Sequence, residues 1–254
     1  MRKAVTFLSG LFMVMVLWSC DSENGLNCFQ AAGDIIQEDF NVAPFQKILV
    51  RQRVQLFISE GPTQRVVVET GANLLNDIVV EVLDNTLVVK NDNGCNIVRD
   101  YGLTKVYVTS PNISQIRNSS GLAVESIGPL TYPELELISE DQENEDEFHI
   151  DGDFRIHFEG GELRLIASGL SNFYLNGTAE TGSFELYDGD SRVEAADLFV
   201  KDLNIFHRST QTMFIHPTES LTGEIRGLGD VISFNRPLIV LVDEYFTGKL
   251  IFQD

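Results

Sequence analysis

The chain has 254 residues, 43% of them hydrophobic, and carries 18 basic against 38 acidic side chains, a formal charge of −20. A charge this negative excludes a general affinity for nucleic acid or for anionic lipid headgroups, because both are polyanions. Seven prolines and a balanced apolar content exclude a largely disordered chain, and the length suffices for one or two domains with a substantial core.

Residues 1–20 predict a leader for export. Arg2 and Lys3 give it a basic start, and the apolar run over 7–18 is long enough for a signal-peptide core and too short to span a bilayer. The run ends in Leu17-Trp18-Ser19-Cys20, which resembles the lipobox of bacterial lipoproteins. That resemblance implies cleavage before Cys20, a diacylglycerol on its thiol and an anchor on the outer membrane, on its periplasmic or its surface face. The alternative is an ordinary cleaved signal peptide that contains a cysteine.

A tether is expected over residues 21–39, because Asp, Ser, Glu, Asn and Gly concentrate between Asp21 and Gly33. Its Asp21-Ser22-Glu23 resembles the acidic stretches that follow the lipid cysteine in surface-exposed lipoproteins of the Bacteroidota; a solvated linker is the alternative. Loss of the leader removes two basic residues and no acids, so the mature chain carries 16 basic and 38 acidic residues, a formal charge of −22.

The chain has three cysteines, an awkward number in an exported protein because one thiol is left unpaired. If Cys20 carries the lipid, Cys28 and Cys95 remain as a pair, and we expect them to form a disulfide in an oxidising compartment. Closing a loop of that length stabilises a fold by roughly 4 kcal/mol in the chain-entropy model. Two separate buried thiols are the alternative.

Residues 40–111 alternate between apolar and polar side chains, which is typical of strands with one buried face. Turns are expected at Gly61-Pro62 and at Asp84-Asn85, the latter as a hairpin, and a single helical turn over 71–76. No amphipathic helix of three turns is present, so we expect an all-β protein. The predicted strands centre on residues 48–50, 54–58, 66–68, 78–82, 87–89 and 106–108.

The second half of the chain repeats itself, with two sets of positions that recur at the same spacing. The turn residues Gly169, Gly189, Ser209 and Gly227 are 20, 20 and 18 residues apart. The apolar residues Phe173, Val193, Met213 and Val231 are also 20, 20 and 18 residues apart.

A period of this length, made of short strands and tight turns, predicts coils of a short right-handed β-solenoid that stack about 4.8 Å apart. An antiparallel meander sandwich is the alternative. Leu135 precedes Leu163 by 28 residues, and the excess is explained if the acidic segment 140–147 is a loop inserted into one coil. We therefore divide the chain after the tether into a strand-rich amino-terminal part, 40–111, and solenoid repeats, 112–254.

The opening strands carry a family resemblance. The segments 45–48, 54–56, 64–69, 73–75 and 84–87 are similar to the first strands of the bacterial head-GIN domain family of auto-transporter adhesins, and the turns Ser120-Gly121, Ser168-Gly169 and 227–230 are similar to its Ser-Gly-rich turns. The resemblance covers roughly 40–252. It implies a pectin-lyase-like β-helix and an adhesive role, and it brings no catalytic residues with it.

No recognisable set of catalytic residues appears, and we expect no cofactor and no metal centre. The acidic segment 140–147 has the oxygen ligands that Ca²⁺ prefers but lacks the spacing of an EF-hand loop, so a solvated insertion is the better explanation. His149 and His157 are eight residues apart and lack a zinc signature. His207 alternates with Ile205 and is expected inside the fold or at the end of a strand. Four aspartates lie at turns of the repeat and are the candidates for paired carboxylates of glycoside chemistry: Asp151, Asp153, Asp188 and Asp190.

Most aromatic residues of the repeats are expected in the core. Tyr174, Phe206 and Phe214 adjoin inward positions, so alternation places them outside as a candidate binding stripe; contact with the amino-terminal part is the alternative. Three arginines fall next to the turn column, where stacking or separate salt bridges explain them equally: Arg192, Arg208 and Arg226.

These features predict a non-catalytic envelope module that presents its surface to a glycan or protein partner and that can also self-associate as a homo-oligomer. The alternative function is a polysaccharide lyase or hydrolase on a β-helix, because such helices host both. That chemistry needs Asp clustered with Arg or Lys on facing coils, and basic residues are few in the repeats.

Overall fold

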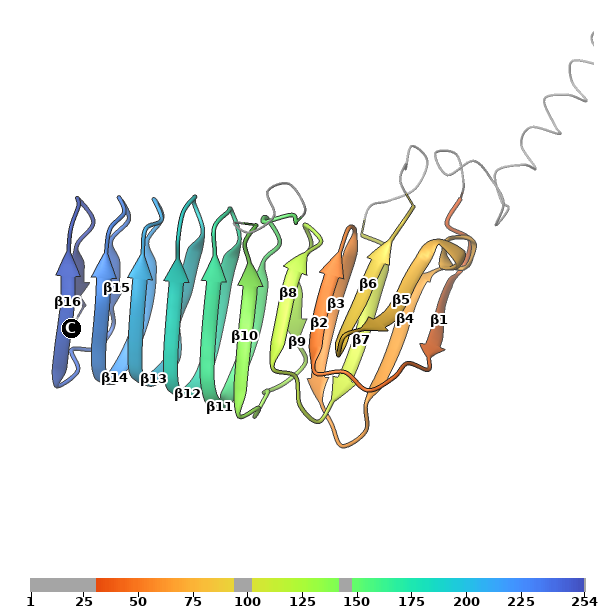
Figure 1. The fold of residues 1–254 in the computed structure, drawn as a ribbon, viewed down its shortest axis with the longest axis horizontal. Coiled ribbons are helices and arrows are strands. Elements are labelled where there is room, and N and C mark those ends of the chain that lie inside the picture. Colours follow the sequence, from red (N-terminus) through yellow and green to blue (C-terminus); the bar gives the residue numbers. More distant parts are fainter. Residues whose placement is uncertain (1–30, 94–101, 142–147, 254) are drawn as a thin grey trace, which may run out of the picture.

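The computed structural model describes residues 31–93, 102–141 and 148–253. Its described strands join into one mixed sheet of 17, and Figure 1 shows them as an elongated stack that runs from β1 at one end to β16 at the other. No helix in these three stretches is long and apolar enough to cross a membrane. The early elements are β1 (Ile35–Phe40), β2 (Lys47–Arg51), β3 (Val54–Glu60), β4 (Arg65–Gly71), η1 (Ala72–Asp77), β5 (Ile78–Leu83), β6 (Thr86–Asn91) and β7 (Thr104–Ser110). The later strands are β8 (Gln115–Ser119), β9 (Val124–Ser126), β10 (Glu134–Ser139), β11 (Phe154–Ala167), β12 (Asn172–Leu186), β13 (Arg192–His207), β14 (Met213–Ile225), β15 (Val231–Ser233), β16 (Ile239–Glu244) and β17 (Leu250–Phe252).

The strands predicted before residue 111 are all present, and the all-β class is confirmed. β3, β6 and β7 bury every second residue, as the alternation of their side chains requires. Asp84 and Asn85 have φ values of 47° and 65°, which suit the tight turn that joins β5 to β6 as an antiparallel hairpin. The predicted helical turn is the 3₁₀ helix η1, whose Leu74 is buried.

The repeat of the second half is a ladder of parallel strands in register. Phe173 pairs with Val193, Val193 with Met213 and Met213 with Val231, which is the apolar column predicted from spacing. The turns stack too, since the amides of Asp190, Thr210 and Gly229 donate to the carbonyls of Gly169, Gly189 and Ser209. Every strand pair among β8–β17 is parallel, so an antiparallel meander does not describe this half.

The acidic insertion leaves the ladder intact. Leu135 pairs with Leu163 and Leu137 with Leu165 in spite of the longer connection between β10 and β11. Residues 142–147 lie outside the described part of the chain, and with them most of the segment considered for Ca²⁺. Glu140, at its start, forms an ion pair of 2.8 Å with Arg117 on β8.

The stack does not follow the sequence at its amino-terminal end. β2 pairs in parallel with β6 on one side and with β8 on the other, while β3 lies in the same way between β7 and β9. The unit β2–β3 is therefore inserted between β6–β7 and β8–β9, and the parallel stack crosses residue 111 without a break. Beyond β6–β7, the strands β5, β4 and β1 close this end with antiparallel pairs.

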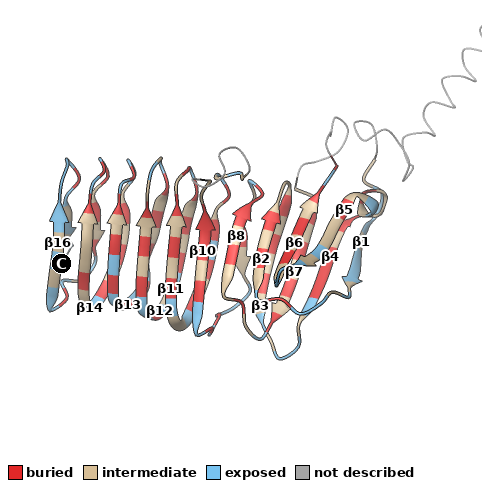
Figure 2. Cartoon of the chain, viewed as in Figure 1, coloured by how far each residue is buried: buried red, intermediate tan, exposed pale blue. Residues whose placement is uncertain are grey.

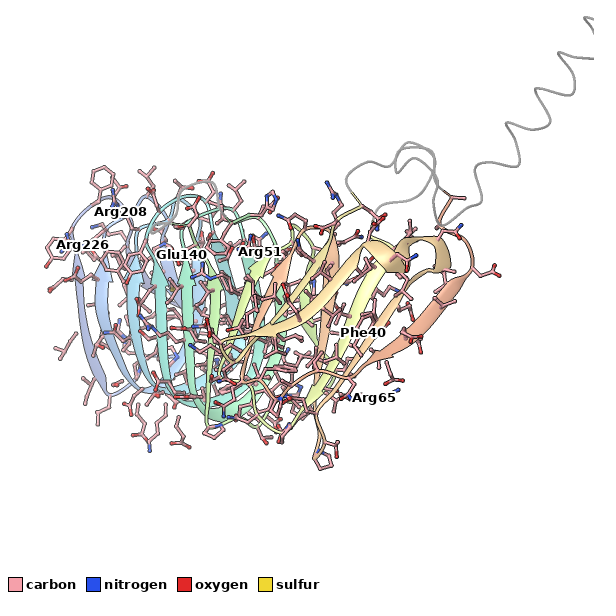
Figure 3. The ribbon with its side chains drawn as sticks, turned by 45° about the vertical axis from the view of Figure 1, so that its right-hand side comes forward. Phe40, Arg51, Arg65, Glu140, Arg208 and Arg226 are labelled. Carbon is pink, nitrogen blue, oxygen red and sulfur yellow. The ribbon has the colours of Figure 1, made fainter. Side chains whose placement is uncertain are left out.

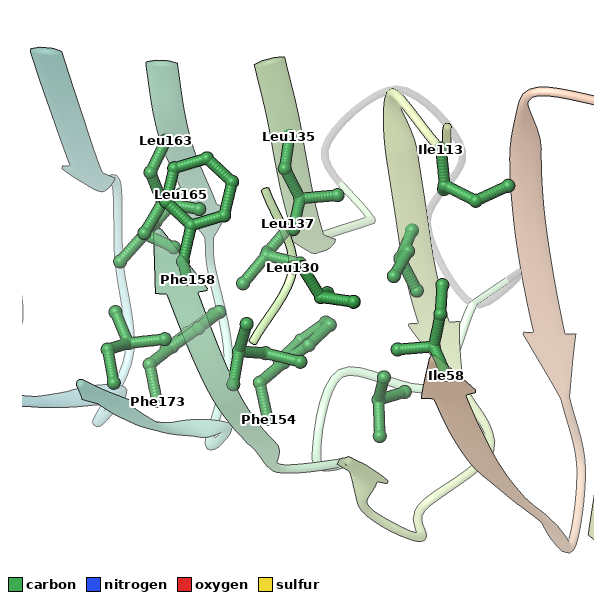
Figure 4. Close-up of a cluster of buried hydrophobic side chains, with 14 of the residues drawn as sticks. Ile58, Ile113, Leu130, Leu135, Leu137, Phe154, Phe158, Leu163, Leu165 and Phe173 are labelled. Atoms are coloured by element: carbon green, nitrogen blue, oxygen red, sulfur yellow. The ribbon is translucent and has the colours of Figure 1, made fainter. Parts of the chain in front are cut away.

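One apolar core runs along the inside of the stack (Figure 2). Phe154 and Phe173 occupy adjacent strands with their rings stacked at 4.9 Å and 6° between planes, among the leucines of β10 and β11 (Figure 4). Two glycines are required where backbones approach closely. A Cβ on Gly177 would lie 2.1 Å from the carbonyl oxygen of Phe158, and one on Gly223 would lie 1.9 Å from that of Ile205.

The three cysteines lie outside the described residues. The lipid on Cys20 and the disulfide between Cys28 and Cys95 therefore stay predictions from the sequence.

Candidate functional site

The predicted aromatic stripe is two separate features. Tyr174 on β12 and Phe214 on β14 share one outward row, because both pair with Glu194 on the strand between them. Phe206 lies in the other half of the coil, where it pairs with Glu185 and Glu224. All three rings are half-buried and point outward. The single stripe was wrong, because alternation along a strand separates inside from outside and does not say which half of a coil a residue occupies.

We call the first feature the Tyr174 row: Arg155, Tyr174, Glu194, Phe214 and Ile232, paired in that order across β11–β15. The guanidinium carbon of Arg155 lies 4.2 Å from the centre of the Tyr174 ring. Phe214 has a ring neighbour in Phe234, 6.2 Å away. Each ring thus has a cation over it, Arg155 for Tyr174 and Arg192 for Phe214.

We call the second feature the Phe206 groove. It is an open depression of about 500 Å³ near the carboxy-terminal end of the stack. Tyr245 and Phe246 are 55% and 58% exposed there, and Tyr187 packs beside Phe206 with 5.2 Å between ring centres. Its lining consists of Phe206, Arg208, Glu224, Arg226, Tyr245 and Phe246.

Two of the three arginines predicted beside the turn column are neighbours. Arg208 and Arg226 directly follow His207 and Ile225, which pair across β13 and β14, and Figure 3 shows both at the same end of the stack. Arg192 begins β13 instead, where it pairs with Glu194 at 2.5 Å.

The charges of the two neighbouring arginines are balanced differently. Arg226 binds Glu224 at 2.5 Å and stacks over Tyr245 at 4.1 Å, and the hydrogen bond to Glu224 raises its pKa. Within the described parts of the chain, the guanidinium of Arg208 has no hydrogen bond and no carboxylate partner. Among the residues that the structure describes, the groove therefore has one cation with a carboxylate partner, Arg226, and one without, Arg208.

An ion-pair network lies on the strands next to Tyr187. Arg164 contacts Glu136 and Glu185, each at 3.0 Å. Burial acts to raise the pKa of Glu185, but hydrogen bonds from Arg164, Tyr187 and Ser183 outweigh it, so the pKa is lowered. Arg164 is thus shared between two carboxylates, and neither Glu136 nor Glu185 is without a basic partner.

Three of the four candidate aspartates accept hydrogen bonds from neighbouring backbone or side-chain groups. Asp153 accepts hydrogen bonds from the backbone and side chain of Asn172, at 3.0 and 2.9 Å. Asp188 accepts the amide of Gly189, Asp190 binds Thr210, and Asp151 is exposed. Among the described residues, Asp153 alone of the four has a basic neighbour, Arg155 at 3.9 Å.

The histidines are dispersed. His157 contacts Glu159 at 3.0 Å and His216 lies 3.0 Å from the carbonyl of Ala196, while His149 is exposed. His207 is fully buried, as one of the two predicted placements requires. Over residues 31–93, 102–141 and 148–253, no group of three or more His, Cys, Asp or Glu side chains is placed to hold a metal ion.

The family described as "Putative auto-transporter adhesin, head GIN domain" matches residues 44–237. The chain belongs to this family. The match includes β2–β15 and thus both the inserted unit β2–β3 and most of the head-GIN repeat.

Three solved structures share the head-GIN fold at low sequence identity. A "putative adhesin" from Bacteroides fragilis has 21% identity and a TM-score of 0.76 over 87% of this chain and 97% of its own. A "putative lipid binding protein" from Parabacteroides distasonis has 15% identity and a TM-score of 0.60 over 87% and 98%. A "putative adhesin" from Parabacteroides merdae has 16% identity and a TM-score of 0.55 over 87% and 97%. A search of the curated proteins found no match.

Sequence reasoning missed Tyr245 and Phe246 as parts of the groove; both follow the residues that match the family. Tyr245 follows Glu244, which pairs with Ile225, so it continues the column of Arg208 and Arg226. The spacing between Arg226 and Tyr245 could have indicated this, because it is close to the spacing between Arg208 and Arg226.

Proposed function

We propose that this head-GIN protein is a non-catalytic binding module of the cell envelope, held to the outer membrane by a lipid on Cys20. Its parallel stack acts as a short right-handed β-solenoid whose outer surface meets a glycan or protein partner. The adhesin descriptions of the family and of two structural neighbours support this class of function. Asp153 and Asp188 support it too, because their carboxylates accept hydrogen bonds from the backbone amides of Asn172 and Gly189.

The observation that carries this proposal is the placement of aromatic rings beside arginines on outward faces. Tyr174 with Arg155 and Phe214 with Arg192 lie on one face, and Tyr245 with Arg226 on another. Exposed rings next to cations are typical of recognition surfaces, whereas a structural core has no need of them.

Binding is tested by incubating the mature chain, purified in detergent, with a panel of neutral and acidic polysaccharides and surface proteins, with and without Ca²⁺. We expect retention of at least one member of the panel without any shortened or unsaturated product. Truncating both rings of the Tyr174 row, by Tyr174→Ala with Phe214→Ala, tests whether that face contributes.

Turnover would contradict the proposal. If a polysaccharide is cleaved and the cleavage is abolished by Asp→Asn at Asp151, Asp153, Asp188 or Asp190, the protein is an enzyme of the lyase or hydrolase class. Retention that is equal for the intact chain and for its heat-denatured form would also reject a specific module.

The anchor is tested separately with Cys20→Ala. We expect the wild-type protein in the detergent phase of a membrane extraction and the variant in the aqueous phase, because lipidation adds roughly 0.8 kcal/mol of membrane affinity per buried methylene. Cys28→Ala is the matched control and keeps the lipid site. A Cys20→Ala protein that stays in the detergent phase would reject lipidation at this residue, and protease treatment of intact cells distinguishes the two membrane faces.

A further inference from the structure

We infer that the Phe206 groove is a saccharide site that recognises a sugar chain carrying an isolated anionic group, such as a uronic acid, with Arg208 as the group that binds the anion. This inference rests on the proposed binding function and assigns it a location and a ligand class.

The groove is built from one column of the parallel ladder. The amide of Arg208 donates to the carbonyl of Leu186, that of Arg226 to His207 and that of Tyr245 to Ile225, so these residues stand on successive strands. Neighbouring strands are about 4.8 Å apart, so the backbones of Arg208 and Arg226 are adjacent, and both side chains line the groove. Tyr187 precedes Arg208 in the same column, so a tyrosine stands on each side of the arginine pair.

Like charges directly opposite each other on neighbouring strands destabilise a sheet. Glu224 forms an ion pair with Arg226 and balances its charge, and it is the one carboxylate in the lining of the groove. Arg208 has no carboxylate partner among the described residues, although the mature chain carries more than twice as many acids as bases. An uncompensated guanidinium in an acidic protein is a feature that a bound anion would satisfy.

The walls of the groove suit a sugar better than a peptide. The backbone amides of Arg208, Arg226 and Tyr245 already donate within the ladder, so they are not available as donors to an extended peptide. What the groove offers is ring surface, from Phe206, Tyr245 and Phe246, against which the apolar face of a sugar ring can pack.

The number of charges limits the ligand. With Arg226 held by Glu224, the lining supplies one free positive charge. The formal charge of −22 on the mature chain repels a dense polyanion at low salt. The ligand class is therefore a mostly neutral saccharide with single, separated carboxylates, bound weakly per site and strengthened when many copies on one cell engage one polymer.

The test is a calorimetric titration of the mature chain in detergent with a trisaccharide of two galactose units that ends in one glucuronic acid, and with the methyl ester of that trisaccharide. The two probes differ in one negative charge and one methyl group. We expect the wild-type chain to bind the acid about three- to fivefold more tightly than the ester, the range of an exposed ion pair. Arg208→Gln should bind both probes alike, and Phe246→Ala should weaken both.

Arg236→Gln is the matched control, because Arg236 is a guanidinium that stacks over Phe252 at 3.8 Å and is not part of the groove lining. It should bind as the wild type does. Equal binding of the acid by wild type and Arg208→Gln, with loss in Phe214→Ala, would move the site to the Tyr174 row and overturn this inference while the proposed function stands. Binding of an acidic peptide in place of either trisaccharide would overturn the ligand class. If the chain retains no polysaccharide and no protein in the wider panel, both proposals fail.

Discussion

Replacing Phe154 with alanine is expected to lower the free energy of unfolding by about 3–5 kcal/mol, a large part of the 5–15 kcal/mol that holds a typical domain together. The ring is fully buried and stacked on Phe173, and its residue pairs with Val124 on β9. Removing it opens a cavity between strands whose backbones are fixed by ladders on both sides, so little collapse can compensate. Urea unfolding followed by circular dichroism measures the loss.

Phe246→Ala is the control for this prediction. It removes the same ring from a position that is 58% exposed, and we expect a change within about 0.5 kcal/mol. A loss below about 1 kcal/mol for Phe154→Ala would mean that the stack can close over the missing ring, which would contradict a rigid core column.

Acidification from pH 7 to pH 4 is expected to lower the free energy of unfolding of the wild-type protein by about 3 kcal/mol more than that of a His207→Leu variant. Burial lowers the pKa of His207 to about 4, an effect that the nearby backbone of Gly229 and Gln211 and the charge of Asp230 partly oppose. Neither ring nitrogen has a hydrogen-bond partner of full geometry among the described residues. The neutral imidazole is therefore the form that the fold accepts.

The direction of this pH effect follows from the protons that the folded and the unfolded chain bind. Above the ordinary pKa of about 6.5 neither state binds the proton, and below it the unfolded chain binds one that the folded chain refuses. Stability is therefore lost as the pH falls from about 6.5 to the folded-state pKa of His207, about 4. Leucine suits the site because the inward neighbours of His207 in the column are Leu186 and Ile225.

Urea unfolding at pH 7, 5.5 and 4 tests this prediction. The carboxylates with lowered pKa values, among them Glu69 and Glu185, lose their contribution as the pH falls further, and they do so in both proteins. His216→Gln is the control and should follow the wild type. Parallel losses in the wild type and in His207→Leu would show that the buried imidazole does not govern acid stability.

The repeats could be predicted because each strand there pairs with the next coil along the chain. Phe173, Val193 and Met213 recur at one spacing for that reason, and the spacing is visible in the sequence. The amino-terminal end shows no such period, since Lys47 pairs with Thr86 on one side and with Gln115 on the other. An inserted unit has two unequal distances to its neighbours, so the stack there could not be inferred from spacing.

The candidate site could also be predicted only in part. Alternation placed Tyr174, Phe206 and Phe214 outside, and all three rings are half-buried. The turn column grouped Arg192, Arg208 and Arg226 and left open whether they stack or form separate salt bridges; only Arg208 and Arg226 of the three follow paired residues. The groove itself depends on which half of a coil each residue occupies and on which carboxylate reaches which arginine. Those are properties of side-chain geometry, and the pairing of Glu224 with Arg226 rather than with Arg208 has no signature in the order of residues.

A change in the number of repeats would affect the two ends of the stack differently. β1, β4 and β5 close the amino-terminal end of the stack, while β16 lies at the opposite end (Figure 1) and Tyr245 of the Phe206 groove directly follows it. In a protein anchored through that leader, the stack is a spacer, and each coil lengthens it by about 4.8 Å. Adding or deleting a coil between β11 and β14 would change the height of the groove above the membrane without altering the closed base. If the proposed lipid on Cys20 anchors the chain, the number of repeats would set the distance from the membrane to the Phe206 groove.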